Sequence, residues 1–228
     1  MELASFLELL YTAGERSRTV CATVNRWQDE ARFIQLLKER GFYQELPPIP
    51  PEEGEWPSMP DESRATTRIW IERPDKLRWE SDHRFDGGSP EQVVGVKDGE
   101  RFWARDMEGE VDSNADRPFE SSMSIPEEVL FEPAPLLGAV RFQLDGEADV
   151  RGRAALRVRA TKRRDGPLTE RPELLSSVAD KWEALVDRER GVLLYLGALA
   201  GGAALSTAEV VDIAFDEPLP GALFEPLS

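Results

Sequence analysis

The chain has 228 residues and a hydrophobic content of 40%, which excludes global disorder and suits one large β domain or two small ones. Its formal net charge of −16 at pH 7 creates a field that repels nucleic acids and anionic lipid surfaces, so neither is an expected partner. The single cysteine, Cys21, excludes an internal disulfide, and its apolar neighbours predict a buried, inert thiol.

The first quarter of the chain predicts two helices around one strand. Apolar residues recur at helical spacing in 2–14 and again in 28–40, where Gly41 ends the pattern. Between them, 19–27 alternates and is rich in β-branched residues, which predicts a strand. The passage 46–60 is rich in proline and glutamate and cannot pair as a central strand, so it predicts a functional or mobile loop.

The middle and the end of the chain predict antiparallel strands. Short apolar runs alternate with charged residues, each run ends in a turn signal, and Asp98-Gly99 is a tight hairpin signal. The expected strands are 66–73, 75–82, 92–98, 101–106, 109–113, 140–149, 154–162, 181–187, 192–199 and 203–215. The connecting segments are loops at 113–124 and 164–177 and a short helical piece at 126–138. Many such strands with few helices predict one curved sheet or barrel.

Several phrases carry a resemblance to a known family. They are Trp70-x-x-Arg73-Pro74, then Leu77-x-Trp79, then an apolar strand into Asp98-Gly99 and Phe102-Trp103. The closing phrase FDEPLPGALFEP and the segment PAPLLGAVRFQLDGEADVRGRAALRVRA add to it. Together they cover much of the chain, which resembles the LolA-like proteins of the lipoprotein carrier superfamily, in particular uncharacterised actinobacterial members.

The resemblance implies a fold and a site. The fold is a mainly β (α+β), strongly curved, incompletely closed antiparallel β-barrel with helices covering its mouth, formed as a single domain over 1–228. The cavity between sheet and helices would hold a lipid or acyl chain. Trp70, Leu77, Trp79 and Trp103 match core-strand positions, which makes them the expected ligand-binding residues. Arg73 matches a lid latch, whose guanidinium would hydrogen-bond lid carbonyls and release them when ligand enters.

Strand alternation alone leaves two alternatives open. Leu77 and Trp79 share one strand face, and Ile69 and Ile71 share a face opposite Trp70. A strand with large apolar groups on both faces is covered on both sides, either by a packed core or by a ligand cavity. The first alternative predicts a filled interaction module that docks a protein partner through its acidic surface or its Pro-rich loop. The second predicts a non-enzymatic protein that binds a hydrophobic ligand.

Catalytic and metal-binding patterns are weak. The one histidine, His83, lies in SDHRFDGG and predicts a solvated loop residue. Asp82, His83 and Asp86 would need a fourth metal ligand. The sequence has no GxSxG elbow, phosphate-binding loop or GxGxxG pattern. We therefore expect no enzyme activity, no cofactor and no metal.

A basic segment opposes the acidic whole. Arg157 and Arg159 would share a strand face within the cluster formed by Arg151, Arg153, Arg157, Arg159, Lys162, Arg163 and Arg164. Aromatic residues do not interleave with these cations, as they would in a surface for nucleic acid. The cluster predicts a solvated sheet face paired with acidic neighbours such as Asp180, Glu183 and Asp187.

The compartment is inferred from the termini and the apolar runs. Glu2 and Glu8 interrupt the N-terminal apolar stretch, which lacks a basic region and a cleavage site, so it is not a typical signal peptide. The longest apolar run, 192–205, falls short of the roughly 20 residues that span a bilayer. We expect no transmembrane segment and a cytoplasmic protein, unless a misassigned start codon hides a leader.

Overall fold

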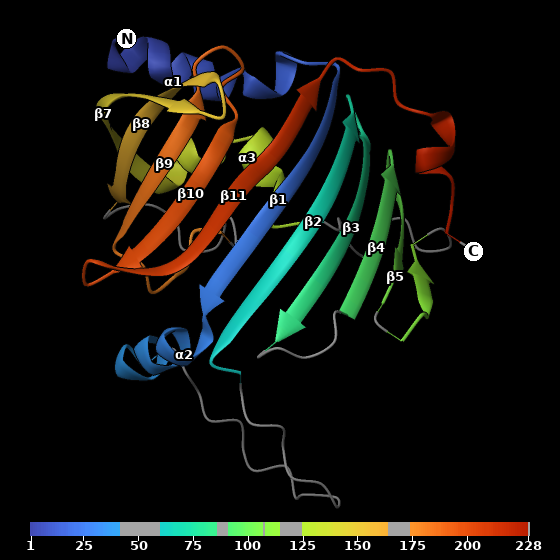
Figure 1. Ribbon diagram of the computed structural model, residues 1–228, viewed down its shortest axis with the longest axis horizontal. Helices are drawn as coiled ribbons and strands as arrows, with labels where there is room; N and C mark the ends of the chain where they lie inside the picture. The colour runs from blue at the N-terminus through green and yellow to red at the C-terminus, as the bar shows by residue number, and fades with distance from the viewer. Residues whose placement is uncertain (42–59, 86–90, 107, 115–124, 164–173, 228) are drawn as a thin grey trace, which may run out of the picture.

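The computed structural model describes residues 1–41, 60–85, 91–106, 108–114, 125–163 and 174–227. In this part of the chain, 11 strands form one antiparallel sheet in the order β6-β5-β4-β3-β2-β1-β11-β10-β9-β8-β7. The predicted loops at 46–60, 113–124 and 164–177 fall largely outside the described residues. Figure 1 shows the curved sheet, with α1 across one end, α2 beyond the other end, and α3 behind the strands.

The elements follow the order of the sequence prediction. The strands are β1 (Thr19–Asp29), β2 (Glu62–Glu72), β3 (Lys76–Phe85), β4 (Glu91–Asp98), β5 (Arg101–Arg105), β6 (Val111–Ser113), β7 (Val140–Val150), β8 (Arg153–Lys162), β9 (Lys181–Asp187), β10 (Leu193–Ala200) and β11 (Ala203–Phe215). The helices are α1 (Leu3–Tyr11), α2 (Glu30–Glu39), α3 (Glu128–Phe131) and α4 (Leu136–Ala139), with 3-10 turns η1 (Ala13–Glu15) and η3 (Gly221–Phe224).

The first strand lies in the middle of the sheet and joins two arms. β1 pairs with β2 on one side and with β11, the last strand, on the other. Each arm is a meander, because strands that follow one another in the chain also lie side by side. The outermost strands, β6 and β7, do not pair with each other in the described part of the chain. The predicted open, curved, mainly β architecture is therefore confirmed.

Element boundaries differ from the prediction where long-range pairing decides them. β1 continues to Asp29, which pairs with Glu62, so the strand is longer than the predicted 19–27 and α2 starts later. The Asp29 side chain accepts a hydrogen bond from the Arg32 amide at 2.9 Å and thereby caps α2. β3 extends to Phe85, which places His83 inside a strand rather than in the predicted polar turn. The helical piece at 126–138 is two single-turn helices.

The register assigns residues to an inner face, covered by α1, α3 and α4, and an outer face. Ile69, Trp79 and Gly95 lie in one cross-strand row on the inner face. Phe6 of α1 packs edge-on against Phe142 of β7, with 5.6 Å between ring centroids. The inner face and the helices form one core whose largest fully buried side chains include Phe6, Leu10, Ile69, Leu130, Phe131 and Leu136.

The C-terminal segment covers part of the outer face. Arg78 of β3 donates a hydrogen bond from Nη1 to the Leu223 carbonyl at 3.1 Å. Lys76 lies over the Phe224 ring, with 5.6 Å between its Nζ and the ring centroid, and Phe224 is buried. Val96, which shares the outer face with Arg78, is fully buried. The sheet thus packs apolar groups on both faces, as the tryptophan-bearing strands predict.

Candidate functional site

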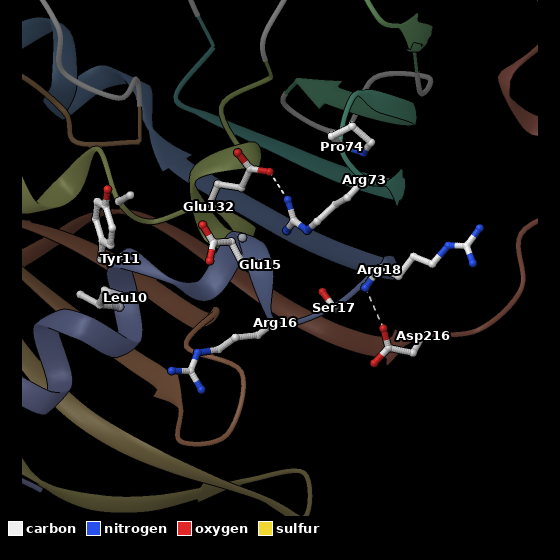
Figure 2. Close-up of a pocket in the computed structure, with 12 residues that line it drawn as sticks. Leu10, Tyr11, Glu15, Arg16, Ser17, Arg18, Arg73, Pro74, Glu132 and Asp216 are labelled. Atoms are coloured by element: carbon white, nitrogen blue, oxygen red, sulfur yellow. Dashed lines mark hydrogen bonds and ion pairs between the residues drawn. The ribbon is translucent and has the colours of Figure 1, made fainter.

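A cavity of about 740 Å³ lies at the end of the sheet where α1, η1, β2 and the residues after α3 meet (Figure 2). Its wall is part apolar and part charged, and includes Leu10, Tyr11, Pro74, Ala134, Arg73 and Glu132. Tyr11 is 69% exposed at this edge, the largest exposed fraction among the exposed large apolar residues described. The cavity therefore offers an apolar surface beside an ion pair, at the boundary between sheet and helices.

Arg73 closes the strand side of the cavity. Its backbone N–H donates to the Arg18 carbonyl at 2.9 Å, which fixes the residue just beyond the end of β2. Its Nη1 donates to Glu132 Oε1 in an ion pair with the segment that follows α3 (Figure 2). Nε and Nη2 of Arg73 are buried and have no hydrogen-bond partner among the described residues. The predicted latch residue thus contacts the helical cover, but through a carboxylate rather than through lid carbonyls.

Asp216 stabilises the opposite wall. The Arg18 backbone N–H donates to Asp216 Oδ1 at 2.8 Å, and Arg190 Nη1 donates to Oδ2 at 2.9 Å. The hydrogen bond from the Arg18 amide has the largest effect on this carboxylate. Together with the bond from Arg190, it lowers the pKa of Asp216 below its ordinary value. The carboxylate is therefore charged at neutral pH, and it connects the start of β1 to the end of β11.

A second ion pair lies at the other end of α3. Glu127, which is only 3% exposed, accepts a hydrogen bond from Arg26 Nη1 at 3.1 Å. The Thr67 hydroxyl donates to the same carboxylate oxygen at 3.2 Å and lies 2.9 Å from the Ser81 hydroxyl. β1, β2 and β3 each contribute to this buried network on the inner face. It fixes the N-terminal end of α3 to three neighbouring strands.

His83 lies beside this network on β3. The register places it in the same row as Ala65 and Arg26, on the inner face, and it is half-buried. Burial lowers the pKa of His83, and the positive charge of Arg26 lowers it further. The negative charge of Glu127 acts in the opposite direction but is the smaller effect. His83 is therefore a neutral, half-buried strand residue at pH 7, which corrects the prediction of a solvated loop histidine.

The register separates the four predicted ligand-binding residues. Leu77 and Trp79 lie on the inner face, and both are buried. Trp70 and Trp103 lie in the outer row with Arg78 and are half-buried. The indole of Trp79 lies over Gly95 of β4, where an added β-carbon would stand 1.9 Å from the ring. The inner pair faces the helical cover, and the outer pair does not.

The sequence prediction missed three charged residues of this site, namely Glu132, Glu127 and Arg26. Glu132 meets Arg73 across 59 positions of the chain, and Glu127 meets Arg26 across 101. No local spacing marks such a pair, because either carboxylate could equally be a solvated residue.

The remaining predicted groups have structural contacts. Arg153 pairs with Asp187 at 2.7 Å, as the basic cluster predicts, whereas Arg159 pairs with Asp145 at 2.8 Å. Cys21 is half-buried rather than buried, and burial raises the pKa of its thiol. No group of three potential metal-binding side chains comes together within the described ranges. No helix in those ranges is long and apolar enough to cross a membrane.

Comparison with known proteins places the fold. No family model and no curated protein matches the sequence. MucB in complex with MucA(peri) has a TM-score of 0.52 at 14% identity, covering 100% of this chain and 60% of that chain. MucB alone has 0.52 at 16% identity, covering 99% and 62%. An uncharacterised conserved protein from Thermus thermophilus has 0.50 at 12% identity, covering 100% and 95%.

The chain has a LolA-like fold. This confirms the architecture that the sequence resemblance implies, at the level of the fold. The chain spans about 60% of the length of the MucB chains that it matches.

Proposed function

We propose that the protein is a non-catalytic binding protein that accommodates a lipid or acyl chain between the inner face and its helical cover. The observation that carries this proposal is that only short helices cover the apolar inner face. The inner face is apolar from β2 to β8, yet α3 and α4 are single turns of four residues each, and α1 has nine. Such short helices have little stability of their own, so packing and side-chain contacts hold them in place.

An apolar ligand would have to replace part of the core. Leu130, Phe131 and Leu136 of the cover are at most 1% exposed, so the described state is filled at this position. Burial of each such side chain contributes roughly 1.5–3 kcal/mol, and lifting the cover forfeits this stabilisation. An acyl chain on the inner face restores the lost apolar contacts, whereas water does not. The cover therefore selects for an apolar ligand.

Arg73 has the position of a latch in this proposal. Its ion pair with Glu132 joins the end of β2 to the cover at the rim of the 740 Å³ cavity. Release of Glu132 leaves the cover attached at its ends but not at this rim. Trp79 and Leu77 beneath the cover are the inner-face residues that we expect to contact an acyl chain. Trp70 and Trp103 face outward, where they support the sheet.

A second candidate function is an interaction module that binds a protein partner. The filled core favours it, because no displacement of Leu130 or Phe131 is then needed. The solved complex of MucB with MucA(peri) is an example of a protein of this fold with a bound partner. In this alternative the partner docks on the acidic surface; the Pro-rich loop at 46–60 lies outside the described residues except for Pro60. A cytoplasmic location stays a prediction from sequence under both alternatives.

Native mass spectrometry of the purified protein separates the two candidates. Added palmitic acid should give a one-to-one adduct that survives buffer exchange, and a fluorescent polyene fatty acid should quench Trp emission in a saturable way. Trp79 and Trp182 both lie in the core under the cover, so Trp79→Phe and Trp182→Phe should each reduce the quenching, whereas Trp70→Phe should retain it. A protein that takes up neither fatty acid contradicts the lipid proposal and favours the protein partner.

A further inference from the structure

The outer face of the sheet carries two neighbouring cavities. One of about 790 Å³ lies over β11, β1, β2 and β3, and one of about 200 Å³ lies over β8, β9 and β10. Among the described residues, neither is lined by the C-terminal segment, which packs farther along β3 and on β4. In Figure 1 this face is turned toward the viewer, because α3 lies behind the strands. The two cavities together are here called the outer hollow.

Two neighbouring cross-strand rows form the floor of the larger cavity. The first row crosses four strands in the order Thr207, Trp27, Arg64 and Arg84. The second row is polar throughout and has Asn25 and Thr66 at its centre. Paired positions on adjacent strands lie about 5 Å apart, so these side chains form one continuous surface. Trp27 is thus a single indole among hydrogen-bond donors and acceptors.

Hydrogen bonds hold this surface in place without a ligand. The Trp27 indole Nε1 donates to Glu62 Oε2 at 2.9 Å, and Arg64 pairs with Oε1 of the same carboxylate at 2.9 Å. The Thr66 hydroxyl donates to Asn25 Oδ1 at 3.0 Å. The indole and its polar neighbours are therefore kept in one arrangement, so a ligand that binds here costs little side-chain freedom.

In the smaller cavity, a tyrosine ring lies along the surface of β10. An added β-carbon at Gly197 would stand 2.6 Å from the Tyr195 hydroxyl oxygen and 3.1 Å from Cε1, so the ring leans over the outward side of this glycine. Gly197 pairs with Thr207, and Thr207 pairs with Trp27. The Tyr195 hydroxyl therefore reaches the cross-strand row of the indole, at a strand position about 10 Å from that of Trp27.

The charges around the outer hollow are nearly balanced, although the chain is strongly acidic. Three arginines and two carboxylates line the larger cavity, and two of each line the smaller one. The whole chain, by contrast, has a net charge of −16. Burial, and then the charges of Glu183 and Glu209, raise the pKa of Tyr195, so its hydroxyl keeps its proton and can donate. A balanced set of donors and acceptors suits a ligand with many hydroxyl groups better than an ion.

Two other classes of ligand fit this surface poorly. An acyl chain requires an apolar wall, whereas the outward side chains of the two rows are mainly polar. A peptide that adds a strand requires an unpaired edge, yet every strand beneath the hollow pairs with a neighbour on both sides. Sugar rings, by contrast, present apolar C–H groups that pack on aromatic faces, and hydroxyl groups that bond polar side chains at the rim.

We propose that the outer hollow binds an extended, uncharged oligosaccharide that crosses the strands from Tyr195 to Trp27. Each of the two rings packs against one sugar unit, and their spacing of about 10 Å corresponds to one disaccharide repeat of an extended β-linked chain. Asn25 and Arg64 bond the hydroxyl groups beside the indole. This site goes beyond the proposed lipid binding and lies on the opposite face of the sheet, so either function can hold without the other.

Isothermal titration with cellohexaose, an extended β-linked glucose chain, tests the site. Wild-type protein should bind it, and Trp27→Ala and Tyr195→Ala should each weaken binding at least about tenfold through the loss of one stacked ring. Trp27→Phe should retain most of the affinity. Trp70→Ala is the matched control, because Trp70 is also a half-buried tryptophan of the outer face but does not line the hollow. This control should bind as wild type does.

Gly197→Ala is a second test variant, which keeps every aromatic and charged side chain. Its methyl group displaces the Tyr195 ring, so cellohexaose binding should weaken severalfold while the melting temperature changes little. Gly138→Ala is its control, since no atom lies within 4 Å of the added β-carbon there. Equal affinities of these two variants would contradict the role of the tyrosine ring.

Three further results would overturn the proposal. The first is no binding of cellohexaose at millimolar concentration. The second is an unchanged affinity in both Trp27→Ala and Tyr195→Ala, which would place the glycan elsewhere. The third is tighter binding of hexagalacturonic acid that added salt abolishes, which would show that the arginines bind an anion. Palmitic acid uptake by Trp27→Ala should equal that of wild type, so failure of this site and failure of the lipid function are distinguishable.

Discussion

Arg73 and Glu132 form an ion pair in which the cation is much less exposed than the anion. The Arg73 side chain is 13% exposed, whereas that of Glu132 is 43% exposed. Removal of a buried charge differs from removal of its partner, because the partner's loss leaves the charge desolvated and unpaired. The pair therefore joins the end of β2 to the helical cover, and the desolvation cost of the pair falls mainly on Arg73.

Substitutions at the two residues should have unequal effects on stability. We expect Arg73→Leu to change the free energy of unfolding by less than about 1 kcal/mol, because it removes buried N–H groups that lack partners. Glu132→Ala should cost about 1–3 kcal/mol, because Arg73 then stays buried without its anion. Urea unfolding of the two variants measures both values. A larger loss for Arg73→Leu than for Glu132→Ala would show that Arg73 is an ordinary structural residue.

A methyl group at Gly95 should disrupt the inner face. The Trp79 indole occupies the space over this glycine, and an added β-carbon would stand 1.9 Å from it. We expect Gly95→Ala to destabilise the protein by about 3 kcal/mol, because a buried indole must move to an unfavourable rotamer. Gly138→Ala is the matched control, since no atom lies within 4 Å of its added β-carbon. Thermal unfolding should show a large drop for the first and none for the second; equal effects would contradict the packing described.

Glu128 should make stability depend on pH in the mildly acidic range. Burial raises the pKa of this carboxyl above its ordinary value of 4.5, and the positive charges of Lys97 and Arg73 only partly oppose the shift. A raised folded pKa means that the fold favours the protonated form. The contribution of protonated Glu128 to the stability of the fold is therefore fully present below pH 4.5, and it is lost as pH rises through the folded pKa.

The neutral isostere of Glu128 tests this sign. We expect Glu128→Gln to raise the melting temperature at pH 7 and to lose that advantage near pH 4, where the wild-type carboxyl is protonated too. The exposed Glu108→Gln should change the melting temperature little at either pH. A Glu128→Gln variant that is less stable than wild type at pH 7 would mean that the carboxylate is stabilised in the fold.

His83 offers a direct titration. It is the one histidine of the chain, so its ring signals in a proton NMR spectrum need no assignment. Because burial and then Arg26 lower its pKa, the midpoint should lie below 6.5. The contribution of neutral His83 to the stability of the fold is fully present above pH 6.5, and it is lost as pH falls through the lower folded pKa. Arg26→Leu should raise the midpoint, and Arg26→Lys should keep it low; a wild-type midpoint above 6.5 would contradict the burial of the ring.

Much of the fold could be predicted from local patterns. Alternation of apolar and polar residues predicted the order and type of the strands. The hairpin predicted at Asp98-Gly99 joins β4 to β5, with Gly99 and Glu100 as its two turn residues. Strand ends were less predictable because pairing decides them: β3 continues past its predicted end at Asp82, since β2 pairs with it up to Phe85. His83 was misplaced for this reason.

The sequence by itself determined a curved antiparallel sheet, strands with apolar groups on both faces and the position of Arg73 at a strand end, because these depend on periodicity and on neighbours in the chain. That the sheet stays open was implied only by the resemblance to LolA-like proteins. Only the tertiary structure decided that Trp79 faces the helical cover while Trp70 and Trp103 face outward, and that Glu132 and Glu127 pair with arginines. The physical reason is that face and partner depend on register and on contacts between residues far apart in the chain, which no local pattern encodes.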